Sequence, residues 1–212
     1  NLSFDESASI PVVGLTTLQA LADIAKLSKG ENVLIHAGSG GIGSFAIQLA
    51  KHLGADVTTT TSTKNILFVK SLGADKVIDY TSQNYLDEGA AFDVVYDTLG
   101  GNHTMDSFKV LKDGGRVVSI KGTVDSITAK QLGLNRLIQM IIAFQARKVF
   151  KAASKMNASY RFLYMSPNGE QLKKIAKLYE SGKLKPLLDK TYKFSESVQA
   201  LEYLSKGHAK GK

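Results

Sequence analysis

Hydrophobic and polar positions change in blocks along the 212-residue chain, and the blocks predict six strands separated by helices. Short runs of apolar and β-branched residues suit strands buried on both faces, and the stretches after them carry apolar residues at helical spacing. The predicted strands cover residues 33–37, 56–61, 76–80, 92–97, 116–120 and 160–165. This alternation predicts an α/β fold, a doubly wound Rossmann fold with a mainly parallel six-stranded sheet in the order 3-2-1-4-5-6.

The remaining segments are predicted to be helical. Residues 1–29 predict two short linking helices around Pro11, and the last two helices are expected over residues 166–181 and 195–204. Residues 126–158 mix apolar and basic positions, so they could line a cleft, cover the sheet or meet a partner. Packing on the sheet is the commonest use of such a stripe.

The composition fits a single domain over residues 1–212, because 43% hydrophobic residues suffice for one core. No apolar run approaches the roughly 18 residues of a membrane span, and the first residues lack the regions of a signal peptide. The chain contains no cysteine. We therefore expect a cytoplasmic protein without a membrane partner, without disulfides and without cysteine-ligated zinc.

The chain is basic, with 27 Lys and Arg against 19 Asp and Glu and a net charge of +8. Much of the excess lies in residues 147–177. Such a run forms a solvated helical face or attracts phosphates and polyanions. No RNA-binding aromatic pattern or helix-turn-helix accompanies it, so no nucleic-acid partner is expected.

A glycine-rich turn stands between the first strand and the helix that follows it. Residues 38–43 read Gly-Ser-Gly-Gly-Ile-Gly, a G-x-G-x-x-G pattern. In this setting Gly38 permits the tight turn, Gly40 lets the main chain approach a pyrophosphate, and Gly43 lets the helix pack on the strand. The free amides at the helix start attract anions, so the pattern predicts a nucleotide site.

The end of the second strand favours NADPH over NADH. An acidic residue there would bond the ribose 2′-hydroxyl of NAD, whereas a 2′-phosphate needs cationic or hydroxyl donors. This chain offers Ser62, Thr63, Lys64 and Asn65, while Asp56 lies at the start of the strand and is expected to point elsewhere. Alternatively, Ser62 or Thr63 simply caps the next helix.

The sequence contains no self-sufficient catalytic group. None of its four histidines, which include His36 and His208, has a partner at metal-ligand spacing, and we expect His36 to be a core or cofactor-edge residue. Asp97 is expected to stabilise the glycine turn after it, and Asn102 to cap the next helix. Tyr80 lies against the phosphate or adenine edge, or simply on the surface. A hydride-transfer cofactor would explain the missing catalytic residues, because the cofactor carries the reactive atom.

These motifs resemble the medium-chain dehydrogenase/reductases, in their zinc-independent quinone oxidoreductase and enone reductase branch. The resemblance rests on residues 8–17, 36–43, 72–80, 92–101 and 167–172, so it extends over nearly the whole chain. It implies NADPH-dependent reduction of quinones or of the double bond of α,β-unsaturated carbonyls. Zinc-dependent relatives place a cysteine ligand just before the glycine corresponding to Gly14, and Val13 stands there in this chain, which implies a metal-free enzyme.

The resemblance also implies the cofactor-binding residues. The pyrophosphate would be held by Gly40, Gly41 and Ile42, and the 2′-phosphate by Ser62, Lys64 and Tyr80. The nicotinamide end would lie near Thr16, Leu99, Ile120, Phe162, Leu163 and Tyr164. Ser39 and Gly100 belong to the same cofactor-binding set.

Members of the family also carry a GroES-like domain before this region and a final strand after it, and we expect both to be absent from residues 1–212. The chain then corresponds to the cofactor-binding part of such an enzyme, with doubtful activity by itself. Family resemblance further implies a homodimer through the sixth strand. The alternative is a non-catalytic module that binds a nucleotide or a polyanion; a methyltransferase is disfavoured because the second strand lacks a terminal acid.

Overall fold

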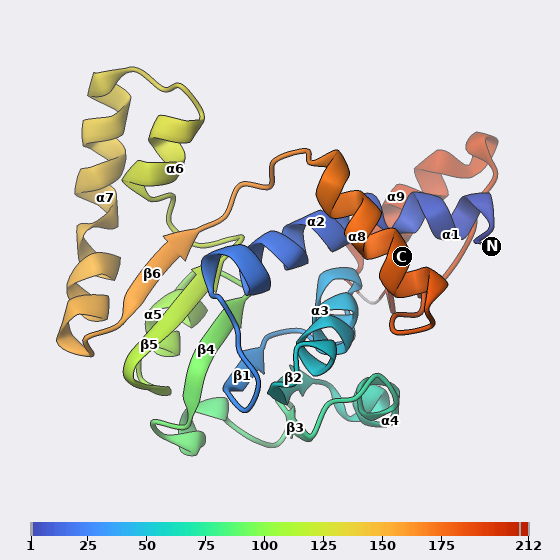
Figure 1. Ribbon diagram of the computed structural model, residues 1–212, viewed down its shortest axis with the longest axis horizontal. Helices are drawn as coiled ribbons and strands as arrows, with labels where there is room; N and C mark the ends of the chain where they lie inside the picture. The colour runs from blue at the N-terminus through green and yellow to red at the C-terminus, as the bar shows by residue number, and fades with distance from the viewer. Residues whose placement is uncertain (1, 208, 212) are drawn as a thin grey trace.

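The computed structural model describes residues 2–207 and 209–211, and a parallel six-stranded sheet forms its centre (Figure 1). The strands are β1 (Asn32–Ile35), β2 (Asp56–Thr61), β3 (Lys76–Asp79), β4 (Phe92–Asp97), β5 (Leu111–Ser119) and β6 (Ser159–Phe162). Their order is β3-β2-β1-β4-β5-β6, and all neighbours run parallel. The predicted fold class and strand order are therefore confirmed.

Helices connect the strands and cover both faces of the sheet. Their bounds are α1 (Phe4–Ser9), α2 (Pro11–Leu18), α3 (Gly41–His52), α4 (Ile66–Ser71), α5 (Asn102–Ser107), α6 (Ser126–Gln131), α7 (Arg136–Lys155), α8 (Gly169–Glu180) and α9 (Ser197–Ser205). Shorter helical turns are η1 (Gln19–Ile24), η2 (Thr63–Asn65), η3 (Tyr85–Glu88) and η4 (Phe194–Glu196).

Several predicted boundaries were wrong. Strand β5 starts at Leu111 because it includes the predicted turn at residues 112–115, with a register shift opposite Phe92 and Val94. Helix α8 starts only at Gly169, where the Asn168 side chain accepts a hydrogen bond from the Gln171 amide. Such boundary differences reflect local capping and pairing geometry, which periodicity does not encode.

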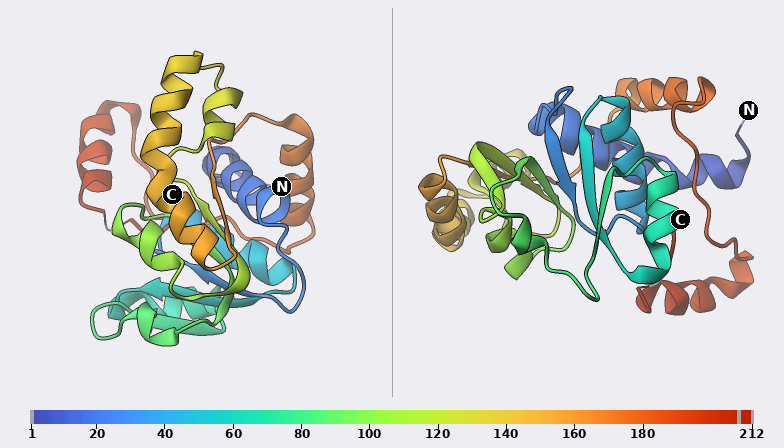
Figure 2. Two further views of the ribbon diagram at one scale, coloured as in Figure 1. Left: turned by 90° about the vertical axis from the view of Figure 1, so that its left-hand side faces the viewer. Right: turned by 90° about the horizontal axis from the view of Figure 1, so that it is seen from below.

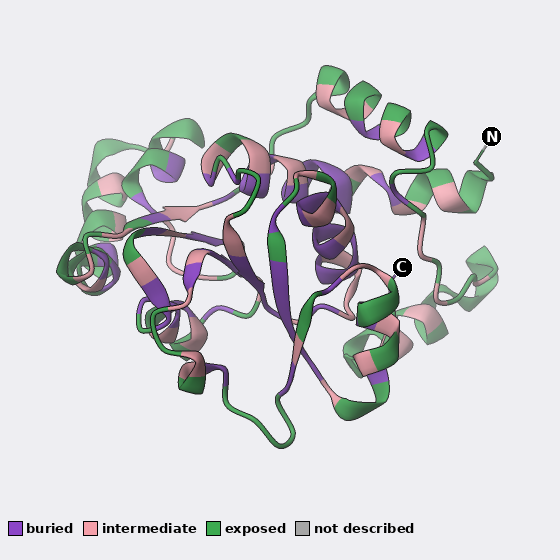
Figure 3. Cartoon of the chain, turned by 60° about the horizontal axis from the view of Figure 1, so that its bottom comes forward, coloured by how far each residue is buried: buried purple, intermediate pink, exposed green. Residues whose placement is uncertain are grey.

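Alternating side chains of the strands build one apolar cluster on each face. Val33 and Ile35 of β1 pack with α3, α4 and η1, whereas Leu34 points to the opposite cluster. That second cluster includes Phe108, which follows α5, and Val149 of α7. Figures 2 and 3 show the resulting layers and the buried strands between them. Because successive side chains of a strand point to opposite faces of the sheet, apolar strands bind helices on both faces.

Helices α2 and α8 form a further layer over α3. Phe45 of α3 packs with Leu15 of α2 and with Ile175 and Tyr179 of α8. The helical run Phe4–Ile24, which contains α1, α2 and η1, is long and apolar enough to cross a membrane by length and composition alone. The expectation that no segment reaches that length was therefore wrong. Half of this run is buried inside the protein, as in a core helix.

Helix α7 packs on the sheet only through its C-terminal half. Its buried residues are Ala146, Val149 and Ala153, whereas Met140 and Phe144 are exposed. Together with α6 it stands beside the β6 edge of the sheet (Figure 1). Residues 126–158 form two helices, α6 and α7. The expected packing on the sheet is confirmed only for the last turns of α7.

Candidate nucleotide-binding site

A cavity of about 940 Å³ lies at the carboxyl ends of β1 to β4. Ligands of open parallel α/β sheets bind at this edge, where strand order reverses. The residues that line the cavity are His36, Ala37, Ser39, Gly40, Thr60, Thr61, Ser62, Lys64, Asn65, Tyr80, Gln83, Asn84, Tyr85, Leu99, His103, Gly207 and Ala209. The structure thus brings together six of the predicted cofactor-binding residues: Ser39, Gly40, Ser62, Lys64, Tyr80 and Leu99.

The turn between β1 and α3 needs glycine at residue 38 for a different reason than predicted. The left-handed residue of the turn is Ala37, with φ 52°. A Cβ atom on Gly38 would lie 2.1 Å from Thr59 Oγ1, and the Gly38 amide donates to the Thr60 carbonyl at 2.9 Å. Gly38 is therefore required by its close approach to β2.

Gly43 has the packing role predicted for it, whereas the contact of Gly40 with a pyrophosphate stays a prediction. Gly40 is the N-cap of α3 and, as a glycine, makes no side-chain capping bond, so no side chain covers the first amides of the helix. A Cβ on Gly40 would meet only the Ala37 carbonyl oxygen, at 3.4 Å, which leaves space above this residue. A Cβ on Gly43 would lie 2.3 Å from the same oxygen, so α3 can approach the turn only with glycine there.

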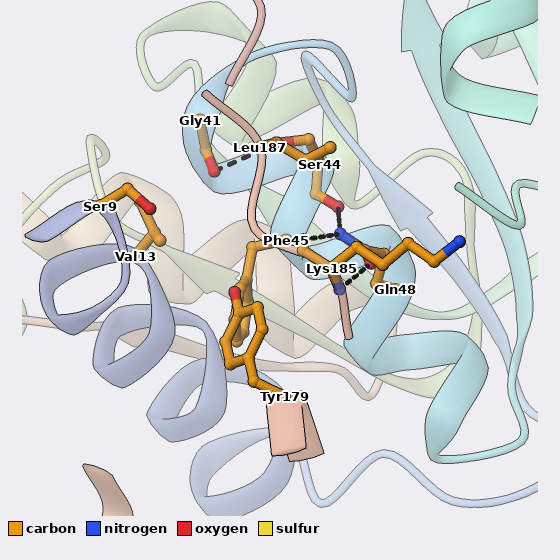
Figure 4. Close-up of a pocket in the computed structure, with 9 residues that line it drawn as sticks. All are labelled: Ser9, Val13, Gly41, Ser44, Phe45, Gln48, Tyr179, Lys185 and Leu187. Carbon is orange, nitrogen blue, oxygen red and sulfur yellow. Dashed lines mark hydrogen bonds between the residues drawn. The ribbon is translucent and has the colours of Figure 1, made fainter. Parts of the chain in front are cut away.

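The outer side of α3 is closed by protein. Gly41 lies beside Leu187 in a small separate pocket between α2, α3 and α8 (Figure 4). There Gln48 donates to the Lys185 carbonyl at 3.2 Å and accepts from the Lys185 amide at 2.9 Å. A ligand can therefore reach the start of α3 from the side of the large cavity that Gly40 lines.

At the end of β2, polar side chains hold one another in place. Asn65 donates through Nδ2 to Ser39 Oγ at 3.1 Å and to Ser62 Oγ at 3.3 Å. One amide thereby joins the glycine turn to the predicted 2′-phosphate residues. Asn65 Oδ1 is buried without a partner among the described residues. Asn65 was named in the sequence only as a residue of the strand end, and its bridging role was missed.

The alternative that Ser62 or Thr63 merely caps a helix is wrong. Neither η2 nor α4 receives a side-chain capping bond. Thr63 instead donates to the Asp79 carboxylate, which also accepts from Thr81. These hydroxyl donors, Thr63 first, lower the pKa of Asp79 below its usual range. Asp79 is therefore an ionised group beside Tyr80 that the sequence analysis did not place near the site.

The turn after β4 is organised by Asp97, as predicted. Its carboxylate accepts from the Leu99 amide at 3.0 Å and the Gly100 amide at 2.8 Å. Leu99 is 39% exposed and lines the cavity, on the same wall as Tyr80 and His103. The predicted capping role of Asn102 was wrong, because Gly101 precedes the helix as its cap and Asn102 is already helical.

The remaining predicted residues lie outside this cavity. They are Thr16, Gly41, Ile42, Gly100, Ile120, Phe162, Leu163 and Tyr164. Thr16 is buried in α2 and donates to the Val12 carbonyl at 2.6 Å, while Ile120 and Leu163 belong to one apolar cluster. The assignment of Gly41 and Ile42 to the pyrophosphate, of Gly100 to the cofactor-binding set and of the other residues to the nicotinamide end stays a prediction.

The C-terminal segment borders the site. Gly207 and Ala209 line the cavity, and Gly211 forms a β-bridge with Gly40. His208 lies outside the described residues. Within residues 2–207 and 209–211, no group of three or more His, Asp or Glu side chains could hold a metal ion.

Three aromatic rings form a wall that sequence reasoning did not assemble. His36 lies 4.7 Å from Tyr85 and 5.6 Å from His103 between ring centroids. They come from the end of β1, from η3 and from α5. No local pattern links three residues so far apart in the chain. His36 is a buried core residue, one of the two places expected for it, and its place at a cofactor edge stays a prediction.

Burial lowers the pKa of His36 to about 4, partly offset by Asp97 and reinforced by His103. Between pH 6.5 and pH 4 the His36 imidazole is therefore protonated in the unfolded chain and neutral in the folded chain. Acidification over this range destabilises the fold. The protonation of His36 alone lowers the free energy of unfolding by roughly 3 kcal/mol over this range.

We expect the free energy of unfolding of His36→Asn to fall less between pH 7 and pH 4.5 than that of the parent chain, measured by urea denaturation. Equal losses in both proteins would show that His36 is not the group responsible.

The sheet and the glycine turn define an α/β Rossmann fold, and the polar cavity at its carboxyl edge is a candidate nucleotide site. Residues 72–212 match the family model described as zinc-binding dehydrogenase. The chain therefore belongs to this family, within the medium-chain dehydrogenase/reductase superfamily.

Several known proteins that are similar to this chain are reductases or oxidoreductases. It is 38% identical over its whole length to 2-methylene-furan-3-one reductase of Solanum lycopersicum and 34% identical to an NADPH-dependent alkenal/one oxidoreductase of Arabidopsis thaliana. A quinone oxidoreductase structure from Coxiella burnetii matches 99% of the chain with a TM-score of 0.81 and 36% identity, and 60% of that protein is covered. The chain spans about half the length of the curated relatives it matches, 47% for each plant enzyme.

Proposed function

We propose that this chain is the NADPH-binding part of an oxidoreductase that reduces quinones or α,β-unsaturated carbonyls. The observation that carries the proposal is one cavity that combines Gly40 at the start of α3 with Ser62 and Lys64 at the end of β2. When bound, the nicotinamide cofactor supplies the hydride. The chain's own residues bind and orient it.

The cavity fits an anionic dinucleotide at two places. The uncapped start of α3 and the space above Gly40 suit a diphosphate. Lys64 and the Ser62 hydroxyl suit a second phosphate on the ribose. Among the described residues no Asp or Glu lines the cavity, and the carboxylate of the nearby Asp79 is bonded to Thr63 and Thr81. This charge distribution favours NADPH over NADH.

Substrate class and metal independence rest on similarity. Among the relatives whose names state a substrate are a furanone reductase, an alkenal/one oxidoreductase and a quinone oxidoreductase. The lack of cysteine and the Val13 position support a mechanism without zinc. In such a reaction the chain contributes position and electrostatics, as expected when a cofactor carries the reactive atom.

The test is a calorimetric titration of this chain with NADPH and with NADH at the same salt concentration. We expect saturable binding of both and tighter binding of NADPH. No binding of either dinucleotide would overturn the proposal. Reduction of an enone by the chain together with the rest of the enzyme then tests the substrate class.

The alternative polyanion-binding module loses its main support. The basic residues of 147–177 divide between α7, β6 and α8, and α7 and α8 lie well apart, with β6 and α2 between them (Figure 1). They therefore do not form one patch. Salt-dependent RNA binding that NADPH does not compete with would restore this alternative.

Homodimer formation through β6 stays a proposal. The chain itself already bonds part of the outer main-chain edge of β6, so a partner strand could use only the rest of that edge. The outward-facing amide of Phe162 donates to Asp125 at 2.9 Å, and its carbonyl accepts from Thr128 Oγ1 at 2.8 Å. Pairing with a second strand would therefore use the outward groups at Tyr160. Light scattering should give twice the mass of 22.9 kDa, and a monomer mass would contradict the dimer.

The cytoplasmic location of the protein also stays a prediction.

A further inference from the structure

Helix α7 has a face that the described part of the protein leaves uncovered. Its buried residues Ala146, Val149 and Ala153 face the sheet. On the opposite side, at helical spacing, lies a set of exposed residues that we call the outer face: Leu137, Met140, Ile141, Phe144, Lys148, Lys151 and Lys155. Its four large apolar side chains are between 51% and 70% exposed. The outer face is therefore apolar along the first turns of α7 and basic along the last turns.

The apolar part of the outer face lies at the end of α7 that is farther from the sheet. Figures 1 and 2 show that α6, the first turns of α7 and the connection between them project from the body of the protein. Leu132 in this connection is 44% exposed and Ile127 of α6 is 49% exposed. Clustered apolar side chains that remain exposed on a folded protein mark an interaction surface.

The charged side chains of this region are all basic. Residues 126–158 contain no Asp or Glu and six basic residues: Lys130, Arg136, Arg147, Lys148, Lys151 and Lys155. None of these six forms an ion pair within residues 2–207 and 209–211. The Arg147 Cζ atom lies 5.0 Å from the centroid of the Phe144 ring, where the apolar and basic parts meet. Charge complementarity thus favours a partner that is anionic and also buries apolar side chains.

Two other classes of partner fit this combination less well. A nucleic acid would bind the lysines through its phosphates and leave Leu137 and Met140 in water. If the α7 helices of two copies overlapped fully, a parallel pair would place lysine against lysine, and an antiparallel pair would place lysines on apolar side chains. If only the apolar parts overlapped, four large side chains of each copy would meet, whereas a stable interface takes about 20–30 residues from each partner.

We propose that the projection formed by α6 and the first turns of α7 is a membrane-contact surface for anionic phospholipids. Leu137, Met140 and Phe144 enter the boundary between headgroups and acyl chains, and the lysines of the outer face bind the anionic headgroups. The expectation of a protein without a membrane partner rested on membrane-spanning segments, and a surface contact needs none. The inference is independent of the proposed function, because no dinucleotide takes part in the contact.

Cosedimentation with lipid vesicles tests the contribution of the lysines. We expect the chain to bind vesicles of phosphatidylcholine with about one-third phosphatidylserine, less so as the salt concentration rises, and to bind pure phosphatidylcholine much more weakly. Lys148→Ala combined with Lys151→Ala should lower the partition coefficient roughly 30-fold, about fivefold for each lysine at the membrane surface. The matched control is Lys174→Ala combined with Lys177→Ala, two exposed lysines of α8, and it should bind nearly as well as the parent chain.

A tryptophan reporter tests whether the apolar end enters the membrane. The chain contains no tryptophan, so the fluorescence of Phe144→Trp comes from that residue alone. Its emission should shift to shorter wavelength on the anionic vesicles, because the indole leaves water. Leu67→Trp is the control, since Leu67 of α4 is 83% exposed and lies outside the projection, and its emission should not shift. Leu137→Ser combined with Met140→Ser should weaken vesicle binding about tenfold or more.

A melting temperature near that of the parent chain confirms that each variant is folded, as expected for exposed positions. If the chain does not bind anionic vesicles, if both α7 double variants bind like the parent, or if the emission of vesicle-bound Phe144→Trp is unshifted, the membrane proposal is overturned. It is also overturned if light scattering shows a dimer that Leu137→Ser with Met140→Ser dissociates, because the outer face then binds a second copy. RNA binding that is lost with the two lysines and kept by the apolar variant, without vesicle binding, would assign the face to nucleic acid. The titration with NADPH tests the proposed function separately in every case.

Discussion

Replacing Lys64 by alanine is expected to weaken NADPH binding about tenfold and to leave NADH binding nearly unchanged. Lys64 lines the cavity beside Ser62 and Tyr80, at the end predicted to receive the 2′-phosphate. A hydrogen bond between charged groups contributes about 1.5 to 3 kcal/mol, and the lower end applies because the Lys64 side chain is exposed. About 1.4 kcal/mol corresponds to a tenfold change in Kd.

Calorimetric titration of both dinucleotides into the variant measures this effect. Lys70→Ala is the matched control, because Lys70 is an exposed lysine of the neighbouring helix α4 and does not line the cavity. It should change neither affinity. If Lys64→Ala weakens NADPH and NADH to the same extent, Lys64 does not recognise the 2′-phosphate. In that case the preference for NADPH would rest on Ser62 and Tyr80.

Replacing Gly43 by alanine is expected to destabilise the fold by roughly 3 kcal/mol, the cost of overpacking a rigid site. The new Cβ would lie 2.3 Å from the Ala37 carbonyl oxygen and 2.7 Å from the Gly38 Cα atom. Both atoms belong to the main chain, so α3 itself has to move away from the turn. For a chain of this size, 1 kcal/mol shifts the melting temperature by about 2–4 °C, so a fall of roughly 6–12 °C is expected in a thermal melt.

Gly40→Ala is the counterpart that separates folding from binding. Its Cβ would meet only the Ala37 carbonyl oxygen, at an ordinary 3.4 Å, so the melting temperature should stay close to that of the parent chain. NADPH binding should nevertheless fall sharply, because the methyl group fills the space above the start of α3. A stable Gly43→Ala variant, or full NADPH affinity in Gly40→Ala, would show that the two glycines do not divide these roles.

Local sequence was sufficient to predict the strands and the edge of the sheet at which the candidate site lies. Each of the first four strands is a short apolar or β-branched run, and the residue that follows it falls at the carboxyl edge of the sheet whatever the details of packing. For that reason Gly40 and Lys64 could be assigned to one site from their positions after two different strands, and the family resemblance added Tyr80 after a third; all three line the cavity. The strand order 3-2-1-4-5-6 followed from the same alternation.

Local sequence was not sufficient where a residue's role depends on a neighbour distant in the chain. Gly38 was assigned to the turn conformation, yet it is the contact with Thr59 that excludes a side chain, and Ala37 carries the positive φ. Likewise, Thr63 was considered as a helix cap, and the structure turns its hydroxyl to Asp79. These partners come from adjacent strands, and strand pairing is not visible in a local pattern.

By itself, then, the sequence determined the doubly wound sheet, the position of the glycine turn and the place of Lys64 at the end of β2, because strand and helix periods and the residues after each strand are local properties. Only the tertiary structure decided that His36, Tyr85 and His103 form one wall of the same cavity. These rings meet because β1, η3 and α5 pack together at one edge of the sheet. Contacts of that kind arise from packing and leave no period in the chain.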